Sequence, residues 1–360
     1  MGHSESKYQQ IVAWVKEKID NGTFQSGDKL ISENELAELF DTSRQTVRHA
    51  TGVLVEQQLV TRIQGSGTYI GGKFRPVRKE KYKNVAVVST FYESYIFPPT
   101  LKGIERELFK AGYSMQVFFT DNKIHREREI LESILEKDNI DGLIVEAVKS
   151  VLPNPNLSYY KKLQERNIPI LCFNTFYPGL SLPCVRIDDS AAAKRAVNLL
   201  IDAGHENIGG IFKSDDGQGP LRYAGFMEGV MDAGIKVTQE HVVWIDTLMT
   251  LNLSEIEDHL RKRLEGCTGV VCYNDQVAFQ LIELVEKWGM RVPEDLSVVG
   301  IDDSSVATSG KVHFTSIPHP KELLGRKVGE NMVAMIENPQ FDGNYMYDME
   351  PVIRKSVCKR

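Results

Sequence analysis

The hydrophobic pattern of this 360-residue chain changes at Asn84, and the change excludes a single fold for the whole length. Before Asn84, apolar residues recur at the three-to-four spacing of short amphipathic helices. After it, β-branched apolar runs alternate with helical patterns, which is typical of a parallel sheet covered by helices. Because 360 residues exceed the usual size of one domain, we expect one domain over 1–72 and another over 84–360.

Residues 73–83 are predicted to link the two domains. They are rich in Lys and Arg, contain Pro76 and lack helical periodicity, which indicates an exposed segment. Its cations suit either contact with DNA phosphates or a solvated spacer, and the sequence leaves both interpretations open.

The charge balance excludes a protein that binds nucleic acid through bulk charge. Lys and Arg total 43 against 49 Asp and Glu, which gives a net charge of −6 at pH 7. Any contact with DNA must therefore be local.

The cysteines and histidines lack the spacings that metal sites and disulfide frameworks require. The five cysteines form no CxxC pair and the eight histidines form no HExxH motif, so we predict buried thiols, no metal and no cofactor. No apolar run approaches the length that crosses a bilayer, and the start of the chain lacks a signal-peptide pattern. We therefore expect a cytoplasmic protein that does not associate with membranes.

The first domain is predicted to contain three short helices, of which the last two form a helix-turn-helix. The first covers about residues 8–19 and stops at Asn21-Gly22. Ser32 and Glu35 have the spacing of a capping box, and Ser43 can cap the third helix. The side chains expected to face the core from the second and third helices are Leu36, Leu39, Phe40, Val47, Ala50 and Leu54.

Two short strands, 59–64 and 68–70, are predicted around the glycines that follow, and they form the wing of a winged helix. Between residues 42 and 72 the charged residues are Arg44, Arg48 and Arg62 against Glu56 alone, so the positive charge lies on the third helix and the wing. Arginine can bind guanine edges or phosphates through two hydrogen bonds. The alternative for any one arginine is a solvated helix face.

These segments resemble the GntR family of winged-helix regulators through residues 32–37 (SENELA), 43–48 (SRQTVR) and 64–69 (QGSGTY). The resemblance implies that the chain binds double-stranded operator DNA, with Arg44, Thr46 and Arg48 on the recognition helix and the glycine tip in the minor groove. The candidate DNA-binding residues are Ser32, Glu33, Asn34, Ser43, Arg44, Gln45, Thr46, Arg48, Gln64, Gly65, Ser66 and Gly67. One departure from the family is Ile31, where proline is usual.

The second domain is predicted to form two similar α/β lobes. Strands are expected at 85–88, 115–119, 142–145 and 169–173 in the first lobe, and at 208–212, 242–245, 269–273 and 298–301 in the second. Ligands of such sheets bind beyond the carboxyl ends of the strands. The binding residues should therefore follow these eight segments.

Polar and aromatic side chains do follow the predicted strands. They are Tyr92, Tyr95, Glu146, Asn174, Lys213, Asn274, Asp275 and Asp302, together with Arg222 after a glycine-rich loop. Carboxylates and amides hydrogen-bond hydroxyl groups and aromatic faces cover C–H surfaces, so the set indicates a small neutral sugar. The alternative is that such Asp and Asn residues cap helices or form turns, and we expect that role for Asp189 and Asp216.

Residues 84–360 resemble the LacI-type sensor domain, a relative in fold of periplasmic sugar-binding proteins. The resemblance is carried by 187–189 (IDD), 222–226 (RYAGF), 273–275 (YND), 292–303 (VPEDLSVVGIDD) and 315–317 (TSI). It implies a two-lobed periplasmic-binding-protein-like domain whose effector is contacted by Arg222, by Asn274 or Asp275, by Asp302 and by His319.

The combination of GntR-type DNA binding with a LacI-type sensor resembles the arabinose-operon repressors of Gram-positive bacteria. Matching segments include 95–98 (YIFP), 142–146 (GLIVE) and 319–321 (HPK). The resemblance implies a homodimeric repressor that L-arabinose releases from DNA, whereas composition and spacing indicate only a small polar ligand. An enzyme acting on sugars is the rival class, and the absence of GxxxxGK[ST] and GxSxG motifs counts against it.

Overall fold

The computed structural model describes residues 6–25, 27–57, 59–63, 67–71, 82–235 and 239–360. The chain divides into two compact units, one within Met1–Lys81 and a larger one formed by Tyr82–Gln164 and Ile168–Arg360. Most of the predicted linker lies outside the described residues. Its last two residues, Tyr82 and Lys83, lead directly into the larger unit.

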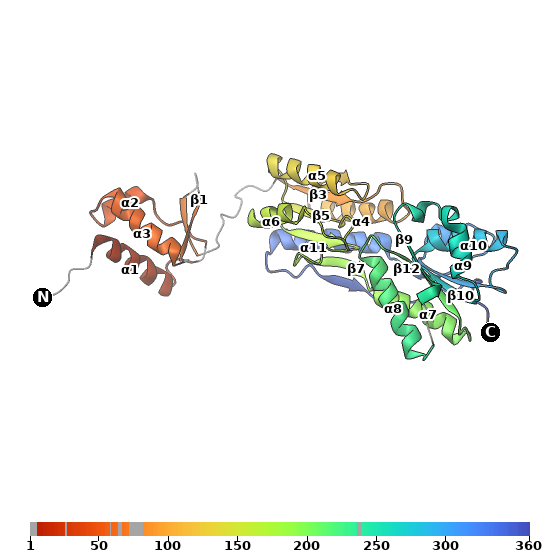
Figure 1. The fold of residues 1–360 in the computed structure, drawn as a ribbon. Coiled ribbons are helices and arrows are strands. Elements are labelled where there is room, and N and C mark those ends of the chain that lie inside the picture. Colours follow the sequence, from red (N-terminus) through yellow and green to blue (C-terminus); the bar gives the residue numbers. More distant parts are fainter. Residues whose placement is uncertain (1–5, 26, 58, 64–66, 72–81, 236–238) are drawn as a thin grey trace. The chain divides into compact units, whose positions relative to one another are not determined.

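The smaller unit, which we call the head, is a winged helix-turn-helix, as predicted. Its elements are α1 (Lys7–Asp20), α2 (Glu33–Leu39), α3 (Arg44–Glu56) and the antiparallel strands β1 (Val60–Ile63) and β2 (Gly67–Ile70) (Figure 1). The capping box at Ser32 and Glu35 is present, and the Ser43 hydroxyl accepts a hydrogen bond from the Thr46 amide at 3.2 Å. These caps satisfy amide groups that the first turn of a helix leaves without partners.

One core prediction in this head is wrong. Leu36 and the predicted inward-facing residues of α3 are buried, but Leu39 is 58% exposed. Because α2 has only seven residues, it turns one narrow face to the core, and Leu36 occupies that face. Phe40 takes the second inward place, where its ring meets the edge of Trp14 with 5.7 Å between the centroids.

The larger unit consists of two lobes, each a parallel sheet flanked by helices (Figure 1). The first lobe has the strand order β13-β7-β6-β5-β3-β4. Its elements are β3 (Asn84–Ser89), α4 (Phe97–Lys110), β4 (Ser114–Phe119), α5 (Ile124–Lys137), β5 (Gly142–Val145), α6 (Leu157–Glu165), β6 (Ile170–Phe173), β7 (Cys184–Ile187), α11 (Lys321–Glu337) and β13 (Tyr345–Tyr347).

The second lobe has the strand order β12-β11-β10-β8-β9. Its elements are α7 (Asp189–Asp202), β8 (Ile208–Lys213), α8 (Gln218–Asp232), β9 (Val242–Ile245), α9 (Glu257–Arg263), β10 (Gly269–Cys272), α10 (Asp275–Lys287), β11 (Ser297–Asp302) and β12 (Thr315–Pro318). Four short 3₁₀ segments, Gln239–His241, Met249–Leu251, Leu253–Ile256 and Ser305–Thr308, complete the described part.

All eight predicted strands of the larger unit are present, with ends within one residue of those expected. Three further strands were missed, namely β7, β12 and β13. Each is three or four residues long, and Arg186, Pro318 and Tyr345 interrupt the apolar character that marks the others. Their pairing with neighbouring strands, rather than their own sequence, makes them strands.

The chain passes between the lobes three times, after β7, after β12 and after β13. These crossing segments lie at one edge of each sheet, so the opposite edges are formed by β4 and β9. This arrangement leaves the carboxyl ends of both sets of strands facing each other across a cleft.

The described helices include none with the length and apolarity that crossing a membrane would need. Cys172, Cys184, Cys267 and Cys272 are buried free thiols, as predicted, and Cys358 is half-buried. Burial raises the pKa of the Cys172 thiol to about 12, so it stays protonated and unreactive at neutral pH.

Candidate effector site and DNA interface

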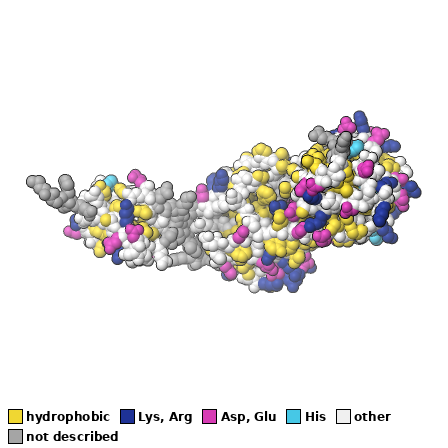
Figure 2. Space-filling model, turned by 90° about the horizontal axis from the view of Figure 1, so that it is seen from below, with side chains coloured by type: hydrophobic (Ala, Val, Ile, Leu, Met, Phe, Trp, Pro, Cys, Tyr) yellow, Lys and Arg dark blue, Asp and Glu magenta, His cyan; other side chains and the backbone are white. Residues whose placement is uncertain are grey.

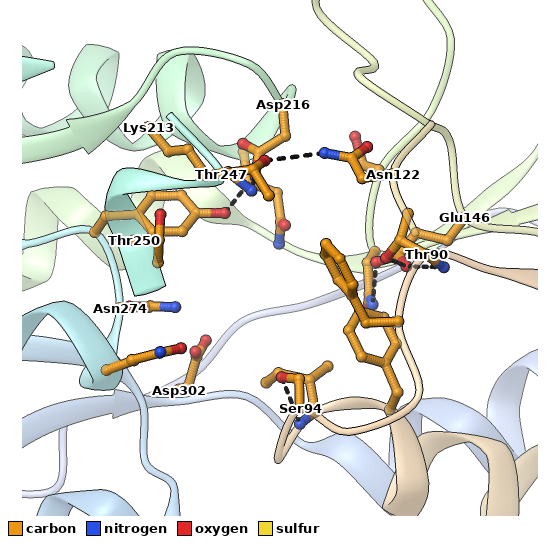
Figure 3. A pocket seen from close by; sticks show the side chains of 18 of the residues that line it. Thr90, Ser94, Asn122, Glu146, Lys213, Asp216, Thr247, Thr250, Asn274 and Asp302 are labelled. Atoms are coloured by element: carbon orange, nitrogen blue, oxygen red, sulfur yellow. Dashed lines mark hydrogen bonds and ion pairs between the residues drawn. The ribbon is translucent and has the colours of Figure 1, made fainter. Parts of the chain in front are cut away.

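A cavity of about 600 Å³ lies between the two lobes (Figure 3). Residues that follow β3, β4, β5 and β6 line it from one side, and residues that follow β8, β9, β10 and β11 line it from the other. This is the position expected for a ligand of parallel α/β sheets. Its size is in the range of small-molecule sites.

Arg222 is the central cation of the cavity. It lies in the second turn of α8 and its side chain is only 2% exposed. Its Nε donates to Asp189 Oδ1 at 2.8 Å, and one terminal nitrogen lies 3.8 Å from Asp302 Oδ1. Another terminal nitrogen donates to the carbonyl of Tyr273, whose ring lies 4.8 Å from the guanidinium carbon.

The start of α8 lies unusually close to the end of β8, which places Arg222 in the cavity wall. A Cβ on Gly219 would lie 1.7 Å from the carbonyl oxygen of Lys213. Only glycine allows this approach of helix and strand.

Lys213 and Asp216 form a second buried ion pair, with 3.0 Å between Nζ and Oδ2. Asp216 also accepts hydrogen bonds from the Tyr273 hydroxyl at 2.6 Å and from the Gly219 amide at 2.9 Å. The neighbouring cation and these donors keep the pKa of Asp216 below its ordinary value despite its burial. Both cations of the cavity are thus already neutralised, which disfavours an anionic ligand.

The opposite wall presents a chain of hydrogen bonds centred on Glu146. Its carboxylate accepts from the Thr90 amide at 3.1 Å, from the Thr90 hydroxyl and from Asn174 Nδ2 at 3.1 Å. Asn174 Oδ1 lies 3.1 Å from His319 Nε2. Burial raises the pKa of Glu146 above its ordinary value.

The protonation of His319 follows from this chain. Because Asn174 uses its amide nitrogen toward Glu146, its Oδ1 must accept from His319 Nε2. Burial, aided by Lys321 and Arg222, lowers the pKa of His319 to about 3, so the ring is neutral. Its Nδ1 is then an acceptor, buried and with no hydrogen-bond partner among the described residues.

The structure brings most of the predicted effector residues into the lining of one cavity, from both lobes. Those that line it are Tyr92, Glu146, Asn174, Lys213, Arg222, Asn274, Asp302 and His319. Tyr95 and Asp275 do not line it. The Tyr95 hydroxyl donates to Asp302 Oδ2 at 2.7 Å, so Tyr95 orients a lining residue from behind.

Two acidic residues that were expected to be cap or turn residues belong to the site. Asp188, not Asp189, caps α7, and the fully buried Asp189 pairs with Arg222. Asp216 has both roles, since it accepts from the Gly219 amide and also lines the cavity. The doubled Asp188-Asp189 was the available signal, because a single cap explains only one of two adjacent acids.

Asp275 is buried and does not line the cavity. Its carboxylate accepts hydrogen bonds from the amide of Ser304 at 2.6 Å and from the hydroxyls of Ser304 and Ser316 at 2.9 Å and 2.5 Å. Burial and then the charge of Asp302 raise its pKa from 3.8 to about 7. The Ser316 hydroxyl hydrogen can rotate away, so that Oγ accepts a hydrogen bond from the protonated carboxyl of Asp275. The neutral form of Asp275 therefore also fits this site.

This raised pKa makes a prediction for stability against pH. The contribution of Asp275 is fully present below about pH 4 and is lost as the pH rises through about 7. In Asp275→Asn the amide takes the place of the neutral carboxyl, so the free energy of unfolding should fall less over this interval than in the unmodified chain. Urea unfolding at a series of pH values measures it, with the exposed Asp258→Asn as control; equal slopes in both variants would contradict the assignment.

The candidate DNA interface is the exposed face of α3 and β1, where most of the predicted DNA-binding residues of the recognition helix lie. Arg44, Gln45 and Arg48 are exposed there, and Arg62 on β1 is 48% exposed. On the face of the head that Figure 2 shows, Lys and Arg lie beside Asp and Glu.

Glu33 links the two arginines that this interface presents from different elements. Its Oε2 lies 2.9 Å from Arg48 Nε and its Oε1 lies 3.0 Å from a terminal nitrogen of Arg62. Ser32 and Ser43 cap α2 and α3, while Asn34 is exposed on α2. Gln64, Gly65 and Ser66 lie outside the described residues, and Gly67 begins β2 with φ +127°.

A winged helix-turn-helix joined to a two-lobed domain with a polar cavity between its lobes defines a ligand-responsive transcription regulator. Residues 7–70 match the model of the bacterial regulatory proteins of the gntR family, and residues 197–357 match that of the periplasmic binding protein-like domain. The chain belongs to the family of GntR-type transcription regulators that carry a LacI-type sensor domain.

The relatives support this assignment along the whole chain. The chain is 35% identical to the arabinose metabolism transcriptional repressor of Halalkalibacterium halodurans, over 99% of this chain and 97% of that protein. It is 36% identical to the repressor of the same name from Geobacillus stearothermophilus, over 97% and 96%. The Escherichia coli K12 repressor CytR is 27% identical over 79% and 82%.

Solved structures agree with the fold. The transcription regulator CcpA of Lactococcus lactis has a TM-score of 0.68 at 23% identity, covering 76% of this chain and 98% of its own. The complex of the regulator CelR with cellobiose has a TM-score of 0.68 at 23% identity, covering 87% and 90%. At this identity the likeness concerns the fold alone.

Proposed function

We propose that this chain represses genes of arabinose use and that L-arabinose, bound between the lobes, releases it from operator DNA. The observation that carries the proposal is the end-to-end similarity to two arabinose metabolism repressors, which spans both the head and the sensor. The protein would act in the cytoplasm, where the operator DNA is. Two experiments test which sugar is the effector and whether that sugar weakens binding to DNA.

The chemistry of the cavity supports a neutral pentose. Carboxylates, amides and a neutral imidazole provide acceptors and donors for hydroxyl groups. The rings of Phe91 and Tyr273 provide faces for the C–H surface of a sugar. Since Arg222 and Lys213 each have a carboxylate partner, a phosphorylated sugar would meet no unpaired cation among them.

In the proposed mechanism, closure of the cleft changes the spacing of the two heads of a dimer. A homodimer places two α3 helices on the halves of a pseudo-palindromic operator, and the sugar stabilises the closed cleft and an arrangement that binds DNA weakly. A coupling free energy of about 1–3 kcal/mol would lower DNA affinity about 5-fold to 150-fold. Reciprocity requires that operator DNA weakens sugar binding by the same factor.

Calorimetric titration of the full-length protein with L-arabinose, D-xylose, D-ribose and D-glucose tests the effector. We expect heat of binding with L-arabinose and a much weaker response to the other sugars. Tighter binding of another pentose would favour the alternative effector while keeping the regulator.

Fluorescence anisotropy with an operator duplex selected from a random library tests the switch. We expect saturating L-arabinose to lower operator affinity at fixed salt concentration. Unchanged affinity would reject the proposed relief of repression. Product formation from any sugar in the panel would instead support the rival proposal of a sugar-converting enzyme, since the cavity contains carboxylates able to move protons.

A further inference from the structure

The two lobes meet at the edge of the cleft that lies farthest from the crossing segments. In strand order, β4 and β9 are the edge strands opposite those that lead into the crossings. The loops that follow them carry Asn122 and Thr247, and Asn122 Nδ2 donates to Thr247 Oγ1 at 3.0 Å (Figure 3). A direct bond thus joins the lobes at this outer edge.

Two more residues complete this contact. The Thr247 hydroxyl donates to Asp215 Oδ2 at 2.8 Å, and Lys149 Nζ lies 3.3 Å from the same oxygen. The amide of Lys149 donates to Asn122 Oδ1 at 2.9 Å. Asn122 and Lys149 from the first lobe and Thr247 and Asp215 from the second therefore form a closed ring of interactions, which we call the interlobe clamp.

The backbone of the clamp is held in an unfavourable conformation. Asp121 and Asn122 have φ values of +51° and +54°, and Lys149 has +42°. Asn and Asp tolerate this left-handed region, but lysine rarely adopts it. Such conformations persist where surrounding contacts hold them, and they concentrate at ligand clamps and switch regions.

The clamp has two layers relative to the cavity. Asn122 and Thr247 line the cavity, whereas Asp215 and Lys149 do not. Asp215 and Asn122 are each 6% exposed, whereas the side chain of Lys149 is 35% exposed. Lys149 can therefore affect a ligand through Asn122, Thr247 and the closure of the lobes, and Asp215 has one further route, since its Oδ1 lies 3.9 Å from Nζ of the lining residue Lys213.

We propose that Asp215 and Lys149 are positioning residues that set effector affinity by stabilising the closed cleft. Opening about the crossing segments moves the β4 and β9 edges farthest, so the clamp exists only in the closed form and biases the equilibrium toward it. A ligand that needs the closed form then binds more tightly by the factor by which the clamp raises its population. This inference rests on the proposed function, because it assumes that the cavity binds the effector.

A double-mutant cycle in the full-length protein tests the clamp. Asp215→Asn keeps an oxygen for Thr247 and removes the charge, and Lys149→Met removes its partner charge. With L-arabinose as probe, each variant is expected to raise the dissociation constant about fivefold through faster dissociation, and the double variant by about the same factor. Lys123→Met, which removes an exposed charge on the same edge, should leave the affinity unchanged.

Independent effects would overturn the proposal. If the two substitutions multiply to about 25-fold, or if neither alters the dissociation constant, Asp215 and Lys149 do not act as one unit across the cleft. An equal rise of the dissociation constant in Lys123→Met would mean that loss of any positive charge at this edge weakens binding, and it would overturn the proposal as well.

Hydrogen exchange without sugar separates this inference from the identity of the effector. The Lys149 amide donates to Asn122 Oδ1 within the first lobe. The Gly217 amide of the second lobe donates to Ser150 Oγ of the first lobe. They should exchange faster in Asp215→Asn and Lys149→Met, while urea unfolding stays as in the unmodified chain. Unchanged exchange rejects the clamp, whereas failure of the unmodified chain to bind L-arabinose rejects only the proposed effector.

Discussion

Replacing Arg222 with methionine is expected to abolish the response to sugar and to lower the free energy of unfolding by about 3–5 kcal/mol. Arg222 is 2% exposed and has Asp189 and Asp302 within 4 Å. Methionine fills much of the volume, but it leaves both carboxylates in a buried site without their cation. An unpaired buried charge costs far more than the pair contributes.

Urea unfolding and calorimetric titration with L-arabinose measure the two effects separately. Arg326→Met, which breaks the exposed pair with Glu322, should change stability by less than about 0.5 kcal/mol. Adding Asp189→Asn to Arg222→Met should restore part of the lost stability, since one uncompensated charge disappears, but it should not restore sugar binding. A variant as stable as the unmodified chain would refute the charge argument.

Replacing Arg48 with alanine is expected to weaken operator binding about 10-fold to 100-fold while sugar binding stays unchanged. Arg48 is 64% exposed on α3, and Glu33 holds its Nε at 2.9 Å, which leaves its terminal nitrogens free to bind a base edge or phosphate. Arg44 and Arg62 are the other arginines of this face, and neither can take the position of the Arg48 side chain on α3.

Fluorescence anisotropy at constant salt concentration measures this loss. Lys16→Ala, on the exposed side of α1, removes the same charge from the head and should have a much smaller effect. Similar losses in both variants would mean that bulk charge, rather than the α3 surface, governs affinity. A parallel loss of sugar binding in Arg48→Ala would indicate misfolding of the variant.

The head was largely predictable because its signals are local. A capping residue and its partner lie three residues apart, so the capping box of Ser32 with Glu35 and the cap at Ser43 could be identified without knowledge of the fold. Leu39 was misplaced because periodicity gives the direction of a side chain on a helix but not the extent of the surface that covers it.

The candidate site was predictable only to the level of strand ends. Residues such as Glu146 and Asp302 could be placed at the cleft because buried runs precede them and parallel strands present their carboxyl ends together. The sequence did not separate Asp188 from Asp189 or place Asp275 behind the wall. Those distinctions depend on which side of a loop faces the other lobe.

The sequence by itself determined the elements, their order, the two domains and the kind of chemistry at the cleft, because helix caps, hydrophobic periods and strand ends act over a few residues. The tertiary structure alone decided the partners. Tyr95 meets Asp302 across 207 residues and Asn122 meets Thr247 across 125, and no local pattern encodes such pairings. They arise when two separately specified lobes close on each other, which is why the ion pairs of the cavity and the interlobe clamp emerge only in the folded chain.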